Sequence, residues 1–291
     1  MCLVALAIDQ SRRFPLVVAS TRDEYFKRPT AGLAWWSPKP GDSAILSGRD
    51  LESGGTWMGL TAQGRLALLT NVRGVLPLEA GAPSRGRVVT EWLTGREETG
   101  DFWMRTALSG YNGFNLIAAD FRRGECFWAS NTDPHPQRLD RGVHGLSNGG
   151  LDAPWPKVDS LKAGLQASLD AARSVDVLAT QLFGALADRR LAADHALPRT
   201  GISIDLERQL SAAFIGTPDQ RYGTRCSTLI ITEKTARQPI THVHERTFDA
   251  AGAVVSLRRA RLRNWPPRYV GDDGHGPVAQ AVVSEHEVAT A

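Results

Sequence analysis

Short apolar runs joined in pairs by polar turns are the feature that most limits how this chain can fold. Apolar runs of this length on either side of a short turn are typical of β-hairpins. In the first half of the chain these runs are CLVALAI (2–8), PLVVAST (15–21), TWMGL (56–60), RLALLTNVR (65–73), FNLIAAD (114–120) and ECFWAS (125–130). Further strands are expected at GVHGLSN (142–148), STLIITE (227–233) and THVHERTF (241–248). Antiparallel hairpins are therefore expected on both sides of the middle part of the chain.

Apolar residues at helical spacing separate these strand regions. The spacing predicts two short helices between Ser84 and Gly110, and two longer ones over 157–172 and 175–188. Hairpins with helices between them favour a layered α+β fold, in which helices cover antiparallel sheets, over alternating βαβ units. We expect one domain over residues 1–271 and a loose tail over 272–291, where no core pattern is visible.

Composition and charge exclude several classes of protein. The 291 residues are 42% hydrophobic and 22% charged, which predicts a folded protein. With a net charge of +3, nucleic acid is not an expected partner, and the basic run at Arg258, Arg259, Arg261 and Arg263 is interpreted as a solvated face. No stretch is apolar enough to span a membrane, and MCLVALAIDQ lacks the basic region and cleavage site of a signal peptide.

Three cysteines, Cys2, Cys126 and Cys226, are too few and too widely spaced for a disulfide framework. A reducing cytoplasm is the expected location. No Cys or His spacing predicts a metal site. We make no prediction of the oligomeric state.

Cys2 is the first candidate for chemistry. Removal of Met1 would leave one residue that carries both a thiol and a free α-amine. The amine, with an ordinary pKa of roughly 8, can accept the thiol proton, and a thiolate is a strong nucleophile. The alternative interpretation is a small apolar residue that opens a strand.

Arg22 and Asp23 follow the second apolar run and begin the segment 22–41, which is rich in charge, Pro and Gly and is predicted to be a loop. Antiparallel pairing of the first two strands would bring both residues close to Cys2. An Arg there would lower the pKa of the thiol, and an Asp would hold the α-amine or orient a substrate amide. A surface ion pair is the alternative.

Four ordered blocks carry a family resemblance that spans residues 2 to about 231. They are TRDEYFKRPT (21–30), SGRDLESGGTWMGLT (47–61) with LLTNVR (68–73), GLSNGGLDAPWPKV (145–158) and YGTRCSTLI (222–230). The sequence resembles the NRDE family, also called the transport and Golgi organisation protein 2 family. The Asn of the family signature is Thr21 here, whereas Arg22, Asp23 and Glu24 are kept.

That family in turn resembles N-terminal nucleophile hydrolases of the penicillin acylase and bile salt hydrolase type, which implies a four-layer αββα sandwich. The resemblance also implies roles for particular residues. Cys2 would be the nucleophile, with Arg22 and Asp23 as its immediate partners and Arg225 as a second cation at the pocket. The oxyanion donors would be Asn148 and, less directly, Asn71. The two asparagines could equally be turn residues, and Arg225 could pair with a carboxylate.

Two functions follow from the sequence. The first is a cysteine amidohydrolase acting on a small molecule, which needs no cofactor. The second is a carrier of haem or of an acyl-CoA-like lipid, which the resemblance suggests because family members are linked to haem trafficking and lipid metabolism. The residues that could line a carrier's apolar pocket are Trp35, Trp36, Trp57 and Trp155, and the alternative is that they pack in the core. The residues that could ligate haem are His135, His144, His242 or Cys126, and their spacing selects none of them.

Overall fold

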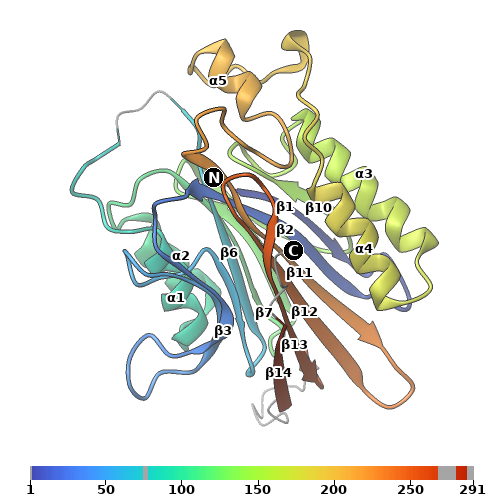
Figure 1. The fold of residues 1–291 in the computed structure, drawn as a ribbon. Helices are drawn as coiled ribbons and strands as arrows, with labels where there is room; N and C mark the ends of the chain where they lie inside the picture. The colour runs from blue at the N-terminus through green and yellow to red at the C-terminus, as the bar shows by residue number, and fades with distance from the viewer. Residues whose placement is uncertain (1, 75–77, 268–279, 287–291) are drawn as a thin grey trace.

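Two antiparallel sheets packed face to face form the centre of the molecule in the computed structural model (Figure 1). The structure describes residues 2–74, 78–267 and 280–286. Sheet A has the strand order β10 (Gly142–Leu146), β1 (Cys2–Ile8), β2 (Leu16–Tyr25), β11 (Tyr222–Lys234), β12 (Pro239–Phe248), β13 (Val254–Arg263) and β14 (Gln280–His286). Sheet B has the order β3 (Thr30–Trp36), β4 (Ile45–Asp50), β5 (Met58–Thr61), β6 (Arg65–Asn71), β7 (Phe114–Asp120), β8 (Glu125–Ser130) and β9 (Asp133–Arg138).

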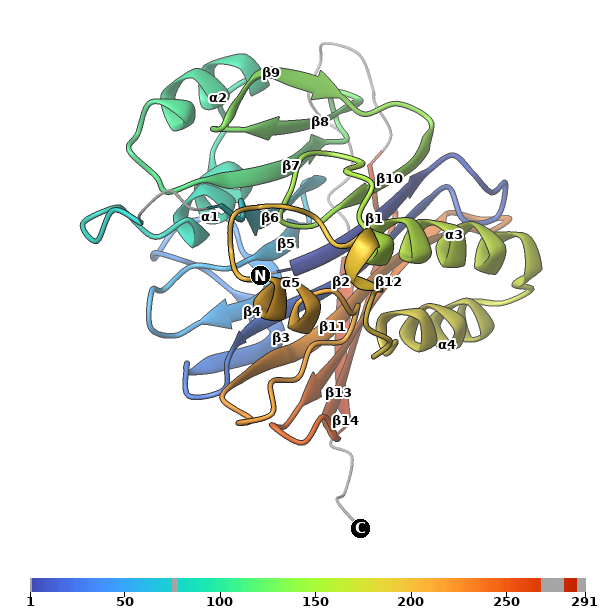
Figure 2. The ribbon, with the colours of Figure 1, turned by 90° about the horizontal axis from the view of Figure 1, so that it is seen from above.

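Helices cover the outer face of each sheet. On sheet A, α3 (Pro156–Ala171) and α4 (Val175–Leu186) pack over β10, β1, β2 and β11. On sheet B, α1 (Gly86–Thr94) and α2 (Thr99–Ala107) pack over the strands around β6 (Figure 2). The layer order confirms the predicted αββα sandwich. No helix in these described ranges is long and apolar enough to cross a bilayer.

The connection from α4 to β11 holds one turn of 3-10 helix (Asp194–Ala196) and α5 (Ile204–Gln209). Neither helix was predicted from the sequence. Figures 1 and 2 both show α5 at the end of the molecule where β1 begins. This connection therefore lies next to the strand that carries Cys2.

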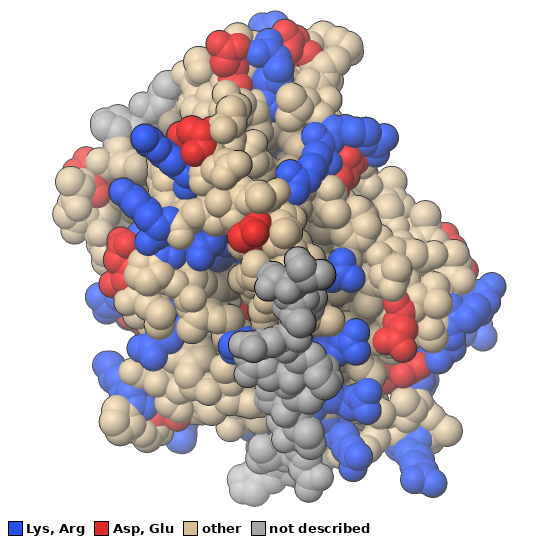
Figure 3. All heavy atoms as spheres, in the orientation of Figure 1, with Lys and Arg blue, Asp and Glu red and all other residues tan. Residues whose placement is uncertain are grey.

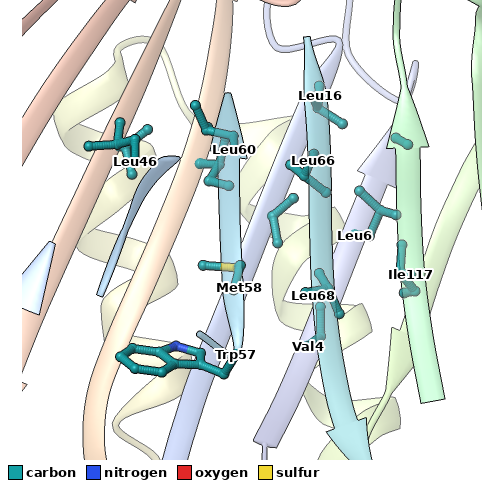
Figure 4. Close-up of a cluster of buried hydrophobic side chains, with 14 of the residues drawn as sticks. Val4, Leu6, Leu16, Leu46, Trp57, Met58, Leu60, Leu66, Leu68 and Ile117 are labelled. Carbon is teal, nitrogen blue, oxygen red and sulfur yellow. The ribbon is translucent and has the colours of Figure 1, made fainter. Parts of the chain in front are cut away.

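Strand alternation divides the apolar residues between separate cores. Successive side chains of a strand point to opposite faces of the sheet. Val4 and Leu6 of β1 thus pack against sheet B (Figure 4), whereas Leu3 and Ala5 pack against α3 and α4. Full burial of a side chain of this kind stabilises the fold by ~1.5–3 kcal/mol relative to exposure. Because both faces of β1 are buried, its backbone position is fixed from both sides.

The segment 22–41, predicted to be a loop, forms regular structure over most of its length. β2 continues to Tyr25, and β3 begins at Thr30 after a tight turn. The loop prediction is therefore wrong for these residues. The charged residues at the end of β2 remain in the sheet because each has a partner: Arg22 contacts Asp50 of sheet B, and Asp23 accepts a hydrogen bond from Thr224.

A strand also lies inside the region predicted to be a loose tail. Residues 280–286 form β14, which pairs antiparallel with β13 from Leu257 to Arg263. The rest of that region, 272–279 and 287–291, lies outside the described residues. The sequence AVVS offers only a short apolar run. β14 obtains its hydrogen-bond partners from β13, a strand that the apolar pattern alone did not reveal.

Candidate functional site

Backbone register brings Cys2 and Arg22 together. Cys2 is the first residue of β1 and pairs with Arg22 of β2. Arg22 in turn pairs with Cys226 of β11 on its other side. The backbone pairing therefore places Cys2 and Arg22 next to each other, as predicted, on adjacent strands of sheet A.

Arg22 reaches from sheet A to sheet B. Its side chain is 5% exposed, and its Nη2 donates to Asp50 Oδ2 at 3.2 Å while Nη1 donates to Thr30 Oγ1 at 3.2 Å. The guanidinium carbon lies 4.4 Å from the ring centroid of Trp57, a distance typical of a cation–π contact. Arg22 is thus a fixed positive charge beside the start of β1.

Asp23 lies on the opposite face of β2 and is fully buried. Thr224 Oγ1 donates to its Oδ1 at 2.7 Å, and the Tyr222 hydroxyl donates to its main-chain carbonyl at 3.1 Å. Burial raises the pKa of Asp23, and the positive charges of Lys157 and Arg22 offset only part of that effect. A carboxyl group with a raised pKa can take up and release a proton closer to neutral pH than an ordinary aspartate.

Arg225 is the extra residue of a β-bulge. The pairing of β11 with β2 shifts between Thr224 and Cys226, and bulges of this kind redirect a side chain. Arg225 Nη1 donates to the carbonyl oxygens of Tyr25 at 2.8 Å and Arg28 at 3.0 Å. It therefore holds the turn between β2 and β3, and its role as a second pocket cation stays a prediction.

Asn71 and Asn148 lie in direct contact. Asn148 is fully buried, and its Nδ2 donates to the Asn71 carbonyl oxygen at 2.7 Å. The backbone N–H of Arg73 donates to the Asn148 carbonyl oxygen at 2.7 Å. These bonds fasten the turn after β10 to the end of β6 and so join the two sheets. Both residues were named as site candidates from the sequence, and their use as oxyanion donors stays a prediction.

A buried ion pair at this end of the molecule was missed by sequence reasoning. Arg73 Nη1 donates to Glu207 Oε2 at 2.6 Å, and the two side chains are 4% and 2% exposed. The Arg73 guanidinium also lies 4.8 Å from the ring centroid of Trp155. Burial lowers the pKa of Arg73, while the negative charges of Glu207 and Asp23 raise it. Arg73 therefore links α5 electrostatically to Asp23.

Lys157, at the start of α3, is a second missed residue. It is buried, its Nζ donates to the Leu210 carbonyl oxygen at 2.9 Å, and its charge acts on Asp23. All three residues of this cluster belong to blocks of the family resemblance: Arg73 to LLTNVR, and Trp155 and Lys157 to GLSNGGLDAPWPKV. Membership of these blocks could have identified the three residues as candidates for the site. No feature of the α5 sequence pointed to Glu207.

Most of the aromatic residues predicted to line an apolar pocket have other contacts. Trp57 lies against Arg22 and Trp155 against Arg73, and Trp36 donates from its Nε1 to Ser47 Oγ at 2.9 Å. Trp35 packs at the edge of the core between the sheets.

The four candidate haem ligands are spread over different parts of the molecule. His135 is exposed on β9, His144 Nε2 lies 3.0 Å from the Asp140 carbonyl oxygen, and His242 lies on β12. Burial raises the pKa of the Cys126 thiol to about 12. In the described ranges no group of three or more His, Cys, Asp or Glu residues could hold a metal ion. Haem ligation stays a prediction.

The residues predicted to act together lie at the same end of the molecule. Cys2 pairs in register with the strand position of Arg22, the buried Asp23 is the next residue of β2, and Asn71 and Asn148 lie at the ends of β6 and β10. A cation favours a thiolate, and amide N–H groups can stabilise an oxyanion.

Comparison with known proteins places the chain among relatives. Residues 1–250 match the family model "Transport and Golgi organisation 2". The transport and Golgi organization protein 2 homolog of Bos taurus is 31% identical over 288 residues, which cover 92% of this chain and 96% of that protein. The Homo sapiens homolog is 32% identical over 253 residues, covering 80% and 89%, respectively.

Two solved structures are also similar. A mutant conjugated bile acid hydrolase from Clostridium perfringens matches with a TM-score of 0.41 at 9% identity, over 83% of this chain and 92% of the other. An N-acylethanolamine-hydrolyzing acid amidase ortholog from Caenorhabditis elegans matches with a TM-score of 0.35 at 10% identity, over 79% and 92%. The extent of the family match and the identity to the animal homologs show that this chain belongs to the Transport and Golgi organisation 2 family.

Proposed function

We propose that this protein hydrolyses an amide bond of a small molecule, with Cys2 as the nucleophile after removal of Met1. The observation that carries the proposal is the register of β1 and β2, in which Cys2 lies opposite Arg22 and next to the strand position of the buried Asp23. A fixed guanidinium beside a thiol stabilises the thiolate, which is the reactive form.

The reaction proceeds in two halves. The thiol passes its proton to the α-amine of Cys2, and the sulfur attacks the amide carbonyl to form a tetrahedral oxyanion. The C–N bond breaks, and the leaving amine takes the proton from the α-ammonium. Water, deprotonated by the same amine, attacks the thioester and releases the carboxylic acid and the thiol. Asp23 keeps the α-amine oriented in this scheme, and Asn148 contributes an N–H to the oxyanion.

Cys2→Ala is the variant that tests the proposal. Hydrolysis of a panel of N-acyl amides is expected to fall at least ~100-fold, because the nucleophile is lost while the binding residues remain. The matched control is Cys126→Ala, which removes a partly buried thiol whose pKa is about 12 and should leave the rate unchanged. Liquid chromatography of the released amine measures both.

The rival function is carriage of haem or of an acyl-CoA-like lipid, and the same preparations distinguish it. An amidase gives turnover that depends on Cys2 and needs no bound cofactor. Turnover that survives Cys2→Ala would contradict the amidase proposal. A Soret band or co-purified lipid in a protein that hydrolyses none of the amides would contradict it as well.

A further inference from the structure

The basic run near the C-terminus is divided between two faces of sheet A. Because side chains alternate along β13, Arg258 points inward, where its Nη1 donates to the Leu33 carbonyl oxygen at 3.2 Å. Arg259 and Arg261 lie on the outer face and are exposed. Their cross-strand neighbours on β12 are histidines, with His244 opposite Arg259 and His242 opposite Arg261. Two cations and two imidazoles therefore share one small area of sheet.

The imidazole rings lie beside the arginines on the adjacent strand and are largely buried. Their centroids are 6.3 Å apart. Among the described residues, the buried His242 Nε2 has no hydrogen-bond partner, and Glu233 Oε2 lies 3.8 Å from it. Glu233 is already engaged, since Arg13 Nη2 donates to its other oxygen at 2.7 Å. A buried polar nitrogen without a partner is an exception in folded proteins, so no described group neutralises the charge of the arginines from this side.

The rings are neutral near pH 7. Burial lowers the pKa of both histidines, and for His244 the value falls to about 4, with the charge of Arg259 adding to the effect. Asp176 on α4 acts weakly in the opposite direction. Each neutral ring keeps one N–H donor.

α4 approaches this face at β12, where the Arg246 guanidinium carbon lies 4.1 Å from the ring centroid of Phe183. α3 and α4 lie over β10, β1, β2 and β11, and β13 extends beyond them (Figure 2). Figure 3 shows several Lys and Arg side chains at the lower right of the face that it presents. Among the side chains that the structure describes, no carboxylate forms an ion pair with Arg259 or Arg261. Positions two apart on a strand are separated by ~6.6 Å, so both guanidinium groups can reach one ligand.

We propose that Arg259 and Arg261, on the exposed face beside His242 and His244, bind the phosphoryl group of a small soluble molecule. A phosphate monoester carries nearly two negative charges and three acceptor oxygens, which match two guanidinium groups. A carboxylate would need only one of the arginines. The site lies on the outer face of sheet A and is independent of Cys2 chemistry, so either proposal can fail without the other.

Inorganic phosphate is the probe. Protein with ¹⁵N-labelled histidine is titrated by NMR from pH 4 to 8 in phosphate and in chloride of equal ionic strength. Phosphate is expected to raise the pKa of His242 and His244 by about one pH unit, because an anion stabilises their charged forms. Arg259→Ala/Arg261→Ala should abolish this response. Arg96→Ala/Arg141→Ala removes the same charge from exposed loops and should retain it.

Three results would overturn the proposal. In the first, phosphate and chloride give the same histidine pKa values in the wild-type protein. In the second, the Arg259/Arg261 double variant responds as the wild type does. In the third, the wild type binds vesicles containing phosphatidylglycerol but not phosphate, which would identify a lipid surface instead of a site for a soluble phosphate ester.

Discussion

Replacing Glu207 by Gln is expected to lower the free energy of unfolding by ~3–5 kcal/mol, because it leaves the buried Arg73 without its counter-ion. Arg73 and Glu207 are 2.6 Å apart, and both side chains are almost completely buried. Thr200 donates from both its N–H and its hydroxyl to Glu207 Oε1, and Gln keeps an acceptor for those bonds. The substitution therefore removes mainly the charge. Urea unfolding followed by tryptophan fluorescence measures the loss.

An exposed pair supplies the control. Arg105 Nη2 and Glu97 Oε2 are 2.7 Å apart, but their side chains are 46% and 44% exposed, so Glu97→Gln should change stability by less than ~1 kcal/mol. A second comparison is the double variant Arg73→Met/Glu207→Met, which removes both charges and should recover much of the loss. If Glu207→Gln were as mild as Glu97→Gln, the ion pair would not hold α5 against the site.

Glu245 and His244 are expected to give opposite pH dependences of stability. Burial raises the pKa of Glu245 to about 7, with a backbone hydrogen bond from Leu33 and the charge of Arg258 as partial offsets. The folded state thus binds this proton more tightly than the unfolded state. Its contribution to stability is full below the ordinary pKa of 4.5 and is lost as the pH rises through 7.

His244 behaves in the reverse sense. Burial and the charge of Arg259 lower its pKa from 6.5 to about 4. Its contribution to stability is full above pH 6.5 and is lost as the pH falls through 4. Each pKa difference corresponds to ~3 kcal/mol, and between pH 4.5 and 6.5 the two contributions oppose one another in the wild-type protein.

Single variants separate the two contributions. Relative to wild type, Glu245→Gln should gain ~3 kcal/mol of stability between pH 4.5 and pH 8, and His244→Asn should gain a similar amount between pH 6.5 and pH 4. Urea unfolding at intervals of one pH unit gives both curves. The explanation is incorrect if each variant differs from wild type by a constant amount over this range.

The sequence contained most of the fold in its local patterns. The predicted hairpin pairs and the four helices predicted between residues 84 and 188 are all present. Each could be predicted because its apolar residues recur at strand or helix spacing within a short stretch of sequence. β3 was missed because its flanking charges resemble those of a loop, and they are neutralised only by contacts with distant residues. Arg22, for example, bonds to Asp50 on another strand.

In the candidate site, too, contacts between neighbouring strands could be predicted and contacts between distant segments could not. Cys2 and Arg22 were expected together because a hairpin register follows from local sequence, and they are paired. Arg73 and Glu207 could not be paired in advance, since 134 positions separate them and only the return of α5 over the end of sheet A brings them together. Long-range contacts of this kind leave no periodic trace in a single sequence.

The most direct measurement of the central claim is the intact mass of the purified protein, followed by brief treatment with a substoichiometric amount of iodoacetamide at pH 7 and peptide mapping. We expect loss of Met1 and modification of Cys2, because Cys226 is buried and the pKa of Cys126 is about 12. Retention of Met1, or modification of Cys126 or Cys226 ahead of Cys2, would contradict a catalytic N-terminal cysteine.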